Sequence, residues 1–267
     1  MKINMVKIIT ILSVVATIMW VGGLFLTIND QFFKNPHPSE PTSTAISLKP
    51  SQTKGISIVA LGDSLTRGTG DSTGKGYVQY MLADLKSRTK QNVELSNLAI
   101  KGLTSQQLLN QLEKTEIQRQ LRDSNLIVMT IGANDLFQGG NTLSNLDQSA
   151  IDSLEKNYVG NLKKIYDTIR EINPQAPVFH VGIYNPFIEL PNSENTSKAV
   201  RRWNFDTAEL AASYKRIVVV PTFDLFEMNV NDNLSSDKFH PNSNGYQLIG
   251  NRVATLINFE KENNQNE

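Results

Sequence analysis

The chain has 267 residues, 39% of them hydrophobic, which is enough for one large domain with a sizeable buried core. Its 26 basic and 26 acidic residues cancel to a formal net charge of zero, which argues against a nucleic-acid-binding protein, because such proteins usually carry a basic excess. Cysteine is absent, and this excludes disulfide scaffolds, thiolate metal sites and cysteine nucleophiles.

The N-terminus combines basic residues with a long apolar run. Residues 1–7 include Lys2 and Lys7, and residues 8–28 carry no charge. A run of about 20 apolar residues can span a bilayer as a helix, and the preceding lysines predict a cytoplasmic N-terminus. We therefore expect a single-pass signal anchor in the cell membrane, with the rest of the chain outside. The alternatives are a buried core helix or a cleaved signal peptide that releases the protein, although a signal peptide has a shorter apolar region of about 7–15 residues.

The composition changes after this run. Residues 29–54 contain four prolines among serines and threonines and show no hydrophobic periodicity, which predicts a partly extended linker. Regular patterning begins at Gly55, so a folded domain is expected over residues 55–260. The polar tail, residues 261–267, is expected to fray.

Within this domain, short β-branched apolar runs alternate with amphipathic stretches. Strands are predicted at residues 56–61, 93–99, 125–132, 177–184 and 217–223. Helices are predicted at residues 77–89, 104–120, 150–172, 197–214 and 244–257. This alternation predicts a three-layer α/β/α sandwich, in which helices cover both faces of a mostly parallel five-stranded sheet.

Polar residues follow several of the predicted strands, and in such sheets ligands bind at the carboxyl ends of the strands. The residues in question are Asp63 and Ser64, Asn97 and Gly102, Asn134 and Asp135, and Asp237 and His240. We therefore expect these residues to meet at one edge of the sheet.

Four of these blocks resemble the GDSL, or SGNH, hydrolase family, which is named after a Ser, a Gly, an Asn and a His in separated blocks. The matching positions are Ser64 in GDSL, Gly102 in NLAIKG, Asn134 in GAND, and His240 with Asp237 in DKFH. The resemblance spans about residues 56–250. It implies a flavodoxin-like three-layer fold and the hydrolysis of esters or thioesters.

The chemistry can also be argued from the residues. A serine hydroxyl becomes a good nucleophile when a base removes its proton, and His240 fits this role for Ser64 because imidazole titrates near neutral pH. Asp237, three residues earlier, could orient the ring. The backbone N–H groups of Ser64 and Gly102 and the side-chain amide of Asn134 could donate to the oxyanion. This chemistry requires no metal and no organic cofactor.

Neighbouring residues have structural explanations. Asp63 is expected to hold adjacent loops, and Asn97 to bond nearby backbone. Asp224 is an alternative triad acid, although the Asp-x-x-His spacing favours Asp237. His180 lies in an apolar strand and is expected to be a core histidine.

A glycine-rich stretch at residues 68–76 fits neither a phosphate loop nor a dinucleotide-binding loop. Thr69 and Gly76 stand where a phosphate loop needs glycine and a hydroxyl residue. The stretch predicts a flexible loop beside Ser64.

The segment after the fourth strand suggests a substrate wall, and we expect Tyr184 and Phe187 to line an acyl pocket. A membrane-tethered domain is well placed to meet lipids, which favours a lipase-like, lysophospholipase-like or thioesterase acyl hydrolase. The family architecture also serves carbohydrate deacetylation, so a cell-wall or glycan O-acetyl esterase is the alternative. An inactive surface-anchored binding module is a hypothesis of another class, and the intact set of catalytic residue types argues against it.

Overall fold

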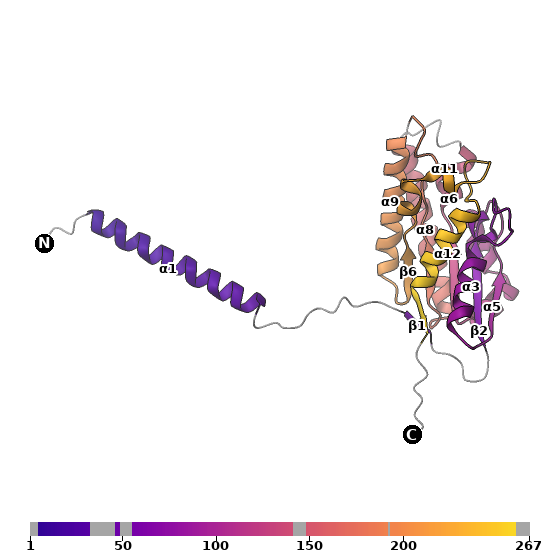
Figure 1. The fold of residues 1–267 in the computed structure, drawn as a ribbon, viewed down its shortest axis with the longest axis horizontal. Helices are drawn as coiled ribbons and strands as arrows, with labels where there is room; N and C mark the ends of the chain where they lie inside the picture. Colours follow the sequence, from indigo (N-terminus) through magenta and orange to yellow (C-terminus); the bar gives the residue numbers. More distant parts are fainter. Residues whose placement is uncertain (1–4, 33–45, 49–54, 141–147, 192, 260–267) are drawn as a thin grey trace, which may run out of the picture. The chain divides into compact units, whose positions relative to one another are not determined.

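A computed structural model describes residues 5–32, 46–48, 55–140, 148–191 and 193–259 (Figure 1). The chain divides into two compact units, Met1–Ala45 and Ile46–Glu267. Most of the expected linker and the whole of the expected tail, residues 261–267, lie outside the described residues.

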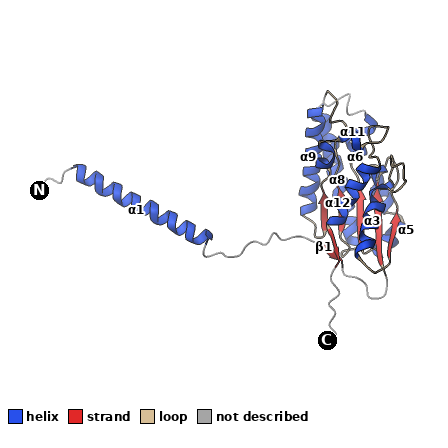
Figure 2. Ribbon diagram, in the orientation of Figure 1, coloured by secondary structure: helices blue, strands red, loops and turns tan. Residues whose placement is uncertain are grey.

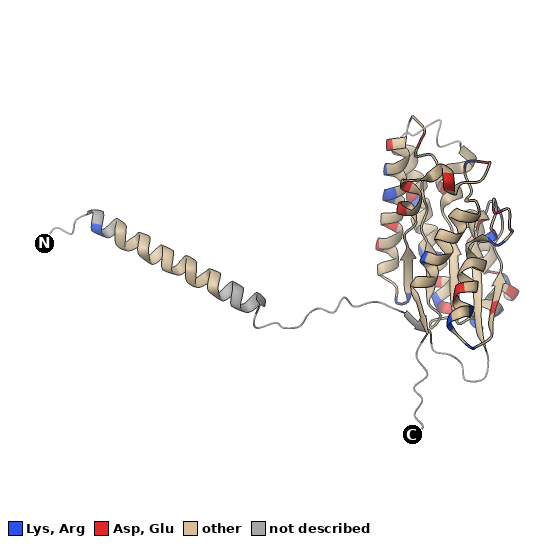
Figure 3. Ribbon diagram, viewed as in Figure 1, with Lys and Arg blue, Asp and Glu red and all other residues tan. Residues whose placement is uncertain are grey.

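The first unit contains helix α1, Met5–Phe32, which includes the uncharged run of residues 8–28. No proline interrupts its hydrogen-bonding pattern. Large apolar side chains are exposed along its described part, among them Met19 and Trp20. In the part of this helix that Figure 3 does not draw in grey, a charged residue stands only near the start. Over the residues that the structure describes, no helix is both long and apolar enough to cross a membrane.

The second unit is built on a five-stranded sheet in which every neighbouring pair is parallel. Its strands are β2 (Ile56–Gly62), β3 (Val93–Asn97), β4 (Leu126–Thr130), β5 (Val178–Val181) and β6 (Ile217–Val220). Their order, β3-β2-β4-β5-β6, is that of flavodoxin-like sheets. The strand order reverses at β2, and in such sheets the crevice at this point binds ligands. The predicted fold class is confirmed.

Helices cover both faces of this sheet (Figure 2). On one face lie α3 (Gly76–Arg88) and α12 (Ser243–Thr255), and on the other lie α4 (Ser105–Leu112), α5 (Thr115–Arg122), α8 (Gln148–Ile172) and α9 (Ser193–Ala212). Along β2, Ile58 and Ala60 pack on the first face, whereas Val59 and Leu61 pack on the second. Because the strand is buried on both faces, its sequence is a continuous apolar run.

The elements differ from the prediction mainly in the connections. The helix predicted at residues 104–120 is two helices, since α4 ends at Leu112 and Lys114 is extended before α5. Short helices that were not predicted are α2 (Ser64–Arg67), α6 (Ala133–Phe137), α10 (Phe223–Glu227), α11 (Val230–Asn233) and the 3-10 turn η1 (Gln138–Gly140). An element of three to five residues is too short to show helical periodicity in the sequence.

The ends of the folded unit also differ from the prediction. Strand β1 (Ile46–Leu48) lies in the expected linker and pairs in parallel with β7 (Ile257–Phe259), where the last helix was expected to end. The folded unit therefore begins at Ile46 rather than at residue 55. This pairing joins segments far apart in the sequence, so no local pattern predicts it. Figure 1 shows β1 at the end of the domain opposite to α11.

Candidate active site

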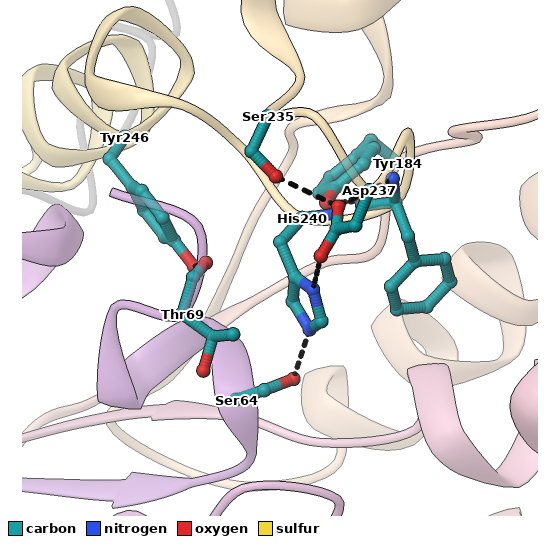
Figure 4. A network of polar contacts seen from close by, with 8 residues as sticks. Ser64, Thr69, Tyr184, Ser235, Asp237, His240 and Tyr246 are labelled. Carbon is teal, nitrogen blue, oxygen red and sulfur yellow. Dashed lines mark hydrogen bonds and ion pairs between the residues drawn. The ribbon is translucent and has the colours of Figure 1, made fainter. Parts of the chain in front are cut away.

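Three polar side chains form a hydrogen-bonded line at the carboxyl end of the sheet (Figure 4). The hydroxyl of Ser64, the first residue of α2, lies 2.8 Å from Nε2 of His240. Nδ1 of the same ring lies 2.6 Å from Oδ2 of Asp237. Because a carboxylate only accepts, Nδ1 carries the proton and Nε2 is free to accept from the serine. The structure thus brings together the three residues expected to form a triad.

Asp237 is held as an anion by its own loop. Its Oδ1 accepts from the backbone N–H groups of Phe239 and His240, at 3.0 and 2.9 Å, and from the hydroxyl of Ser235, at 2.8 Å. Partial burial alone would raise the pKa of Asp237, but these bonds and the one from the His240 ring outweigh burial and hold the pKa below its usual range. The carboxylate therefore stays charged opposite the imidazole.

The alternative acid, Asp224, lies elsewhere. Its carboxylate pairs with Arg252 at 2.8 Å and is largely exposed. The geometry therefore favours Asp237 over Asp224 as the partner of His240.

Tyr184 supports the loop that carries His240. Its hydroxyl donates to the carbonyl of Phe239 at 2.6 Å, and its ring stacks on Phe226 with the ring centroids 4.0 Å apart. Only 4% of Tyr184 is exposed. The expectation that Tyr184 lines an acyl pocket is therefore corrected, because burial on Phe226 leaves its ring beneath the loop.

The loop at residues 68–76, which was expected beside Ser64, lies against His240 and is held by hydrogen bonds. The carboxylate of Asp71 accepts hydrogen bonds from the backbone of Thr73 and Gly76 and from the hydroxyl of Ser243 on α12, each within 2.8 Å. An Asp side chain that accepts a hydrogen bond from the backbone N–H two residues later forms an Asx turn. Sequence reasoning missed this signal. Gly70 of this loop approaches His240 closely enough that even a Cβ would collide with it.

The expected oxyanion donors come from three different segments: Ser64 begins α2, Gly102 lies in the loop after β3, and Asn134 belongs to α6. No hydrogen bond among the described residues uses the backbone N–H of Ser64 or of Gly102. Gly102 has a φ of +78°, a conformation that favours glycine, and a Cβ there would meet no described atom within 4 Å. Asn134 donates one side-chain N–H to the carbonyl of Leu103 at 2.9 Å, which leaves its second N–H for another acceptor.

Asp63 and Asn97 hold loops together, as expected. Oδ1 of Asp63 accepts from the N–H of Leu65 at 3.0 Å and from the hydroxyl of Thr130 at 2.7 Å. Burial raises the pKa of Asp63, because its side chain lies in the protein interior. The side chain of Asn97 donates to the carbonyl of Thr66 at 2.8 Å. Both residues therefore brace the turn that carries the serine.

His180 is a core residue, as predicted. Burial lowers its pKa to about 4, and its Nδ1 lies 2.6 Å from the hydroxyl of Tyr166. It is therefore neutral at physiological pH. Within the described part of the chain, no group of three or more His, Cys, Asp or Glu could hold a metal ion.

Three phenylalanine rings meet beside the histidine. Phe187 lies 5.2 Å from Phe137 and 5.9 Å from Phe239, measured between ring centroids, and Phe239 lies 5.0 Å from the His240 ring. Sequence reasoning predicted only Phe187 here. Phe137 and Phe239 could have been found because they stand inside the segments GANDLF and DKFH.

Comparison with known proteins agrees with this arrangement. The model of the GDSL-like lipase/acylhydrolase family matches residues 60–248. The uncharacterized protein YpmR of Bacillus subtilis is 36% identical over 211 residues, which are 77% of this chain and 82% of that protein. The spore germination lipase LipC of Bacillus licheniformis is 28% identical, over 74% of this chain and 94% of that protein.

A solved structure shares the same architecture. The lipase Lip_vut3 from a goat rumen metagenome superposes with a TM-score of 0.70 and 26% identity, over 77% of this chain and 99% of that one. The family model covers well over half of the chain, and its span includes all the site residues described above. The chain therefore belongs to the GDSL-like lipase/acylhydrolase family of carboxylic ester hydrolases.

Proposed function

We propose that the chain hydrolyses its esters through an acyl-enzyme formed on Ser64. The observation that carries this proposal is the continuous hydrogen-bonded line from Ser64 through His240 to Asp237. As the serine oxygen attacks the ester carbonyl carbon, its proton passes to Nε2 of His240, and Asp237 stabilises the resulting imidazolium. His240 then gives the proton to the departing alcohol.

Water completes the cycle by the same route. His240 takes a proton from water, the resulting hydroxide attacks the acyl carbon, and the bond to Ser64 breaks as the proton returns to its oxygen. The carboxylic acid leaves, and the enzyme is regenerated. In both steps the N–H groups of Ser64 and Gly102 and the amide of Asn134 are the proposed donors to the oxyanion.

For the substrate we propose an acyl ester of a lipase-like, lysophospholipase-like or thioesterase type. Two observations support this proposal: the apolar ring of Phe239 beside His240, with Phe187 packed against it, and the similarity to a spore germination lipase. A glycan O-acetyl ester is the second candidate, because an acetyl group is short enough to need no extended apolar wall.

We also propose that residues 8–28 anchor the protein in the cell membrane, with the hydrolase unit outside. The uncharged run, the lysines before it and the exposed apolar side chains of α1 support this. Protease added to intact cells is expected to remove the hydrolase unit, and its complete protection would contradict the proposed orientation.

The substrate is tested with the full chain in detergent on activated acyl esters of graded length, a lysophospholipid and an acetylated glycan. We expect cleavage of longer acyl esters and loss of all activity in Ser64→Ala. Cleavage of acetyl esters alone would favour the second candidate. Undiminished hydrolysis by Ser64→Ala would refute the proposed nucleophile.

A further inference from the structure

Two consecutive residues of α6 hold the segment that follows Gly102. Asn134 donates to the carbonyl of Leu103 at 2.9 Å. The carboxylate of Asp135 accepts from the backbone N–H of Ser105, with N···O distances of 3.1 and 2.9 Å, and also from the Ser105 hydroxyl. The loop after β3 and the turn after β4 are therefore joined at two points.

A third element completes this link. Asn161 of α8 donates to the hydroxyl oxygen of Ser105 at 3.0 Å. Ser105 is fully buried, and Asp135 is largely shielded from solvent. Hydrogen bonds to a charged acceptor in such surroundings are stronger than exposed ones. Ser105 is thus fixed from two sides, only three residues after Gly102.

Oxyanion stabilisation depends on this kind of fixation. Donors assist when they already point at the position that the oxyanion will occupy, so that no reorganisation is needed during the reaction. Here the N–H of Gly102 and the amide of Asn134 belong to separate segments, the loop after β3 and helix α6. Without a tie between the loops, the two donors could shift relative to one another.

We propose that Asp135 is a positioning residue that holds the Gly102 and Asn134 donors in register by binding Ser105. This inference rests on the proposed serine mechanism. Asp135 acts through Ser105 and exchanges no proton with the substrate. Burial raises the pKa of Asp135 and the bonds from Ser105 oppose this shift, which agrees with a carboxylate that serves as an acceptor.

The test compares Asp135→Asn with the parent protein, both as the full chain in detergent. The substitution keeps the side-chain volume but replaces one acceptor oxygen with a donor that faces Ser105. We expect kcat on an activated ester to fall at least about 10-fold, which is less than the 100- to 1000-fold typical of deleting a donor outright, while KM stays within about twofold. The inhibition constant of a boronic acid, which forms a tetrahedral adduct with the serine, should rise by a similar factor.

Two further variants keep the test decisive. Asp167→Asn is the matched control, because Asp167 is a carboxylate on α8 that bonds Lys163 and Tyr214, and its change should leave kcat and boronic acid binding unaltered. If Asp135→Asn does not fold, Ser105→Ala removes only the hydroxyl bonds and should still lower kcat about three- to tenfold with the same rise in the inhibition constant, as expected for losing part of a preorganised hydrogen-bond network.

Two outcomes would overturn the positioning role. One is an unchanged kcat in the folded Asp135→Asn protein. The other is a lower kcat with boronic acid affinity preserved, which would show that the loss does not arise from the oxyanion donors. Failure of the serine mechanism itself would show separately, as hydrolysis that survives Ser64→Ala.

Discussion

Gly70 lies so close to His240 that a Cβ on Gly70 would stand 2.8 Å from the Cβ of the histidine and 2.7 Å from the carbonyl oxygen of Pro241. Either the glycine loop or the histidine must move to admit a methyl group. A misplacement of about 1 Å can cost roughly 100-fold in rate. We therefore expect Gly70→Ala to lower kcat at least about 10-fold, measured on an activated ester.

Gly74 provides the control within the same loop. Its φ is +69°, against +94° at Gly70, but a Cβ at Gly74 would meet no described atom within 4 Å. Both alanine variants carry a backbone cost of about 1–2 kcal/mol. Gly70→Ala adds the cost of the collision, so its thermal unfolding should shift at least as far as that of Gly74→Ala. Gly74→Ala should keep full activity, and an equal loss of kcat in the two variants would contradict the steric role of Gly70.

The identity of the triad acid can be decided by a pair of substitutions. Asp237→Asn should lower kcat about 10³- to 10⁴-fold, because the amide no longer holds the required tautomer of His240. Asp224→Asn removes only a surface pair with Arg252 and should leave kcat within twofold. The assignment fails if the larger loss occurs in Asp224→Asn.

Acyl-chain preference should depend on Phe187. Replacing it with alanine removes the ring that contacts Phe137 and Phe239, so the ratio of kcat/KM for long against short acyl esters should change several-fold, since each buried methylene contributes about 0.8 kcal/mol. Phe205→Ala is the control, because this phenylalanine is 62% exposed on α9. The same profile of acyl lengths in both variants would exclude Phe187 from the substrate wall.

Stability should depend on pH through Glu155, a residue of α8 that pairs with Arg202 on α9. Burial, a hydrogen bond with Asp206 and the charge of Asp206 raise the pKa of Glu155 to about 7, although Arg202 pairs with it. In the unfolded chain the pKa of a glutamate is near 4.3. At a pH between about 4.3 and about 7, the folded state therefore binds more protons than the unfolded state, and its stability falls as the pH rises through this range.

Thermal unfolding between pH 5 and pH 8 tests this linkage. The melting temperature of the parent protein should fall relative to that of Glu155→Gln, by about 2–4 °C for each kcal/mol. Glu116→Gln, a change at an exposed glutamate on α5, serves as the control and should follow the parent. Parallel curves for the parent and Glu155→Gln would show that Glu155 does not titrate in this range.

The sequence predicted the sheet and the reacting groups because both leave local signals. β2 is a continuous apolar run that ends at Gly62, and the polar residues after it stand where a parallel sheet gathers its ligand-binding loops. The predicted role of Tyr184 as a pocket-lining residue was wrong, because an aromatic residue after a strand can equally well line a pocket or support a loop from the protein interior. The contact of Gly70 with His240 joins residues far apart in the chain, so it could not be read from either segment alone.

The β1–β7 pair has a mechanical consequence. The chain enters the hydrolase unit at Ile46, and β7 begins just after α12, whose 13 residues span about 20 Å from its start beside His240. A pull on the N-terminal segment would therefore load the backbone bonds of β1 and β7 first. The catalytic loops, at the other end of α12, would be spared that load, so tension on the N-terminal segment would leave the alignment of Ser64 and His240 undisturbed.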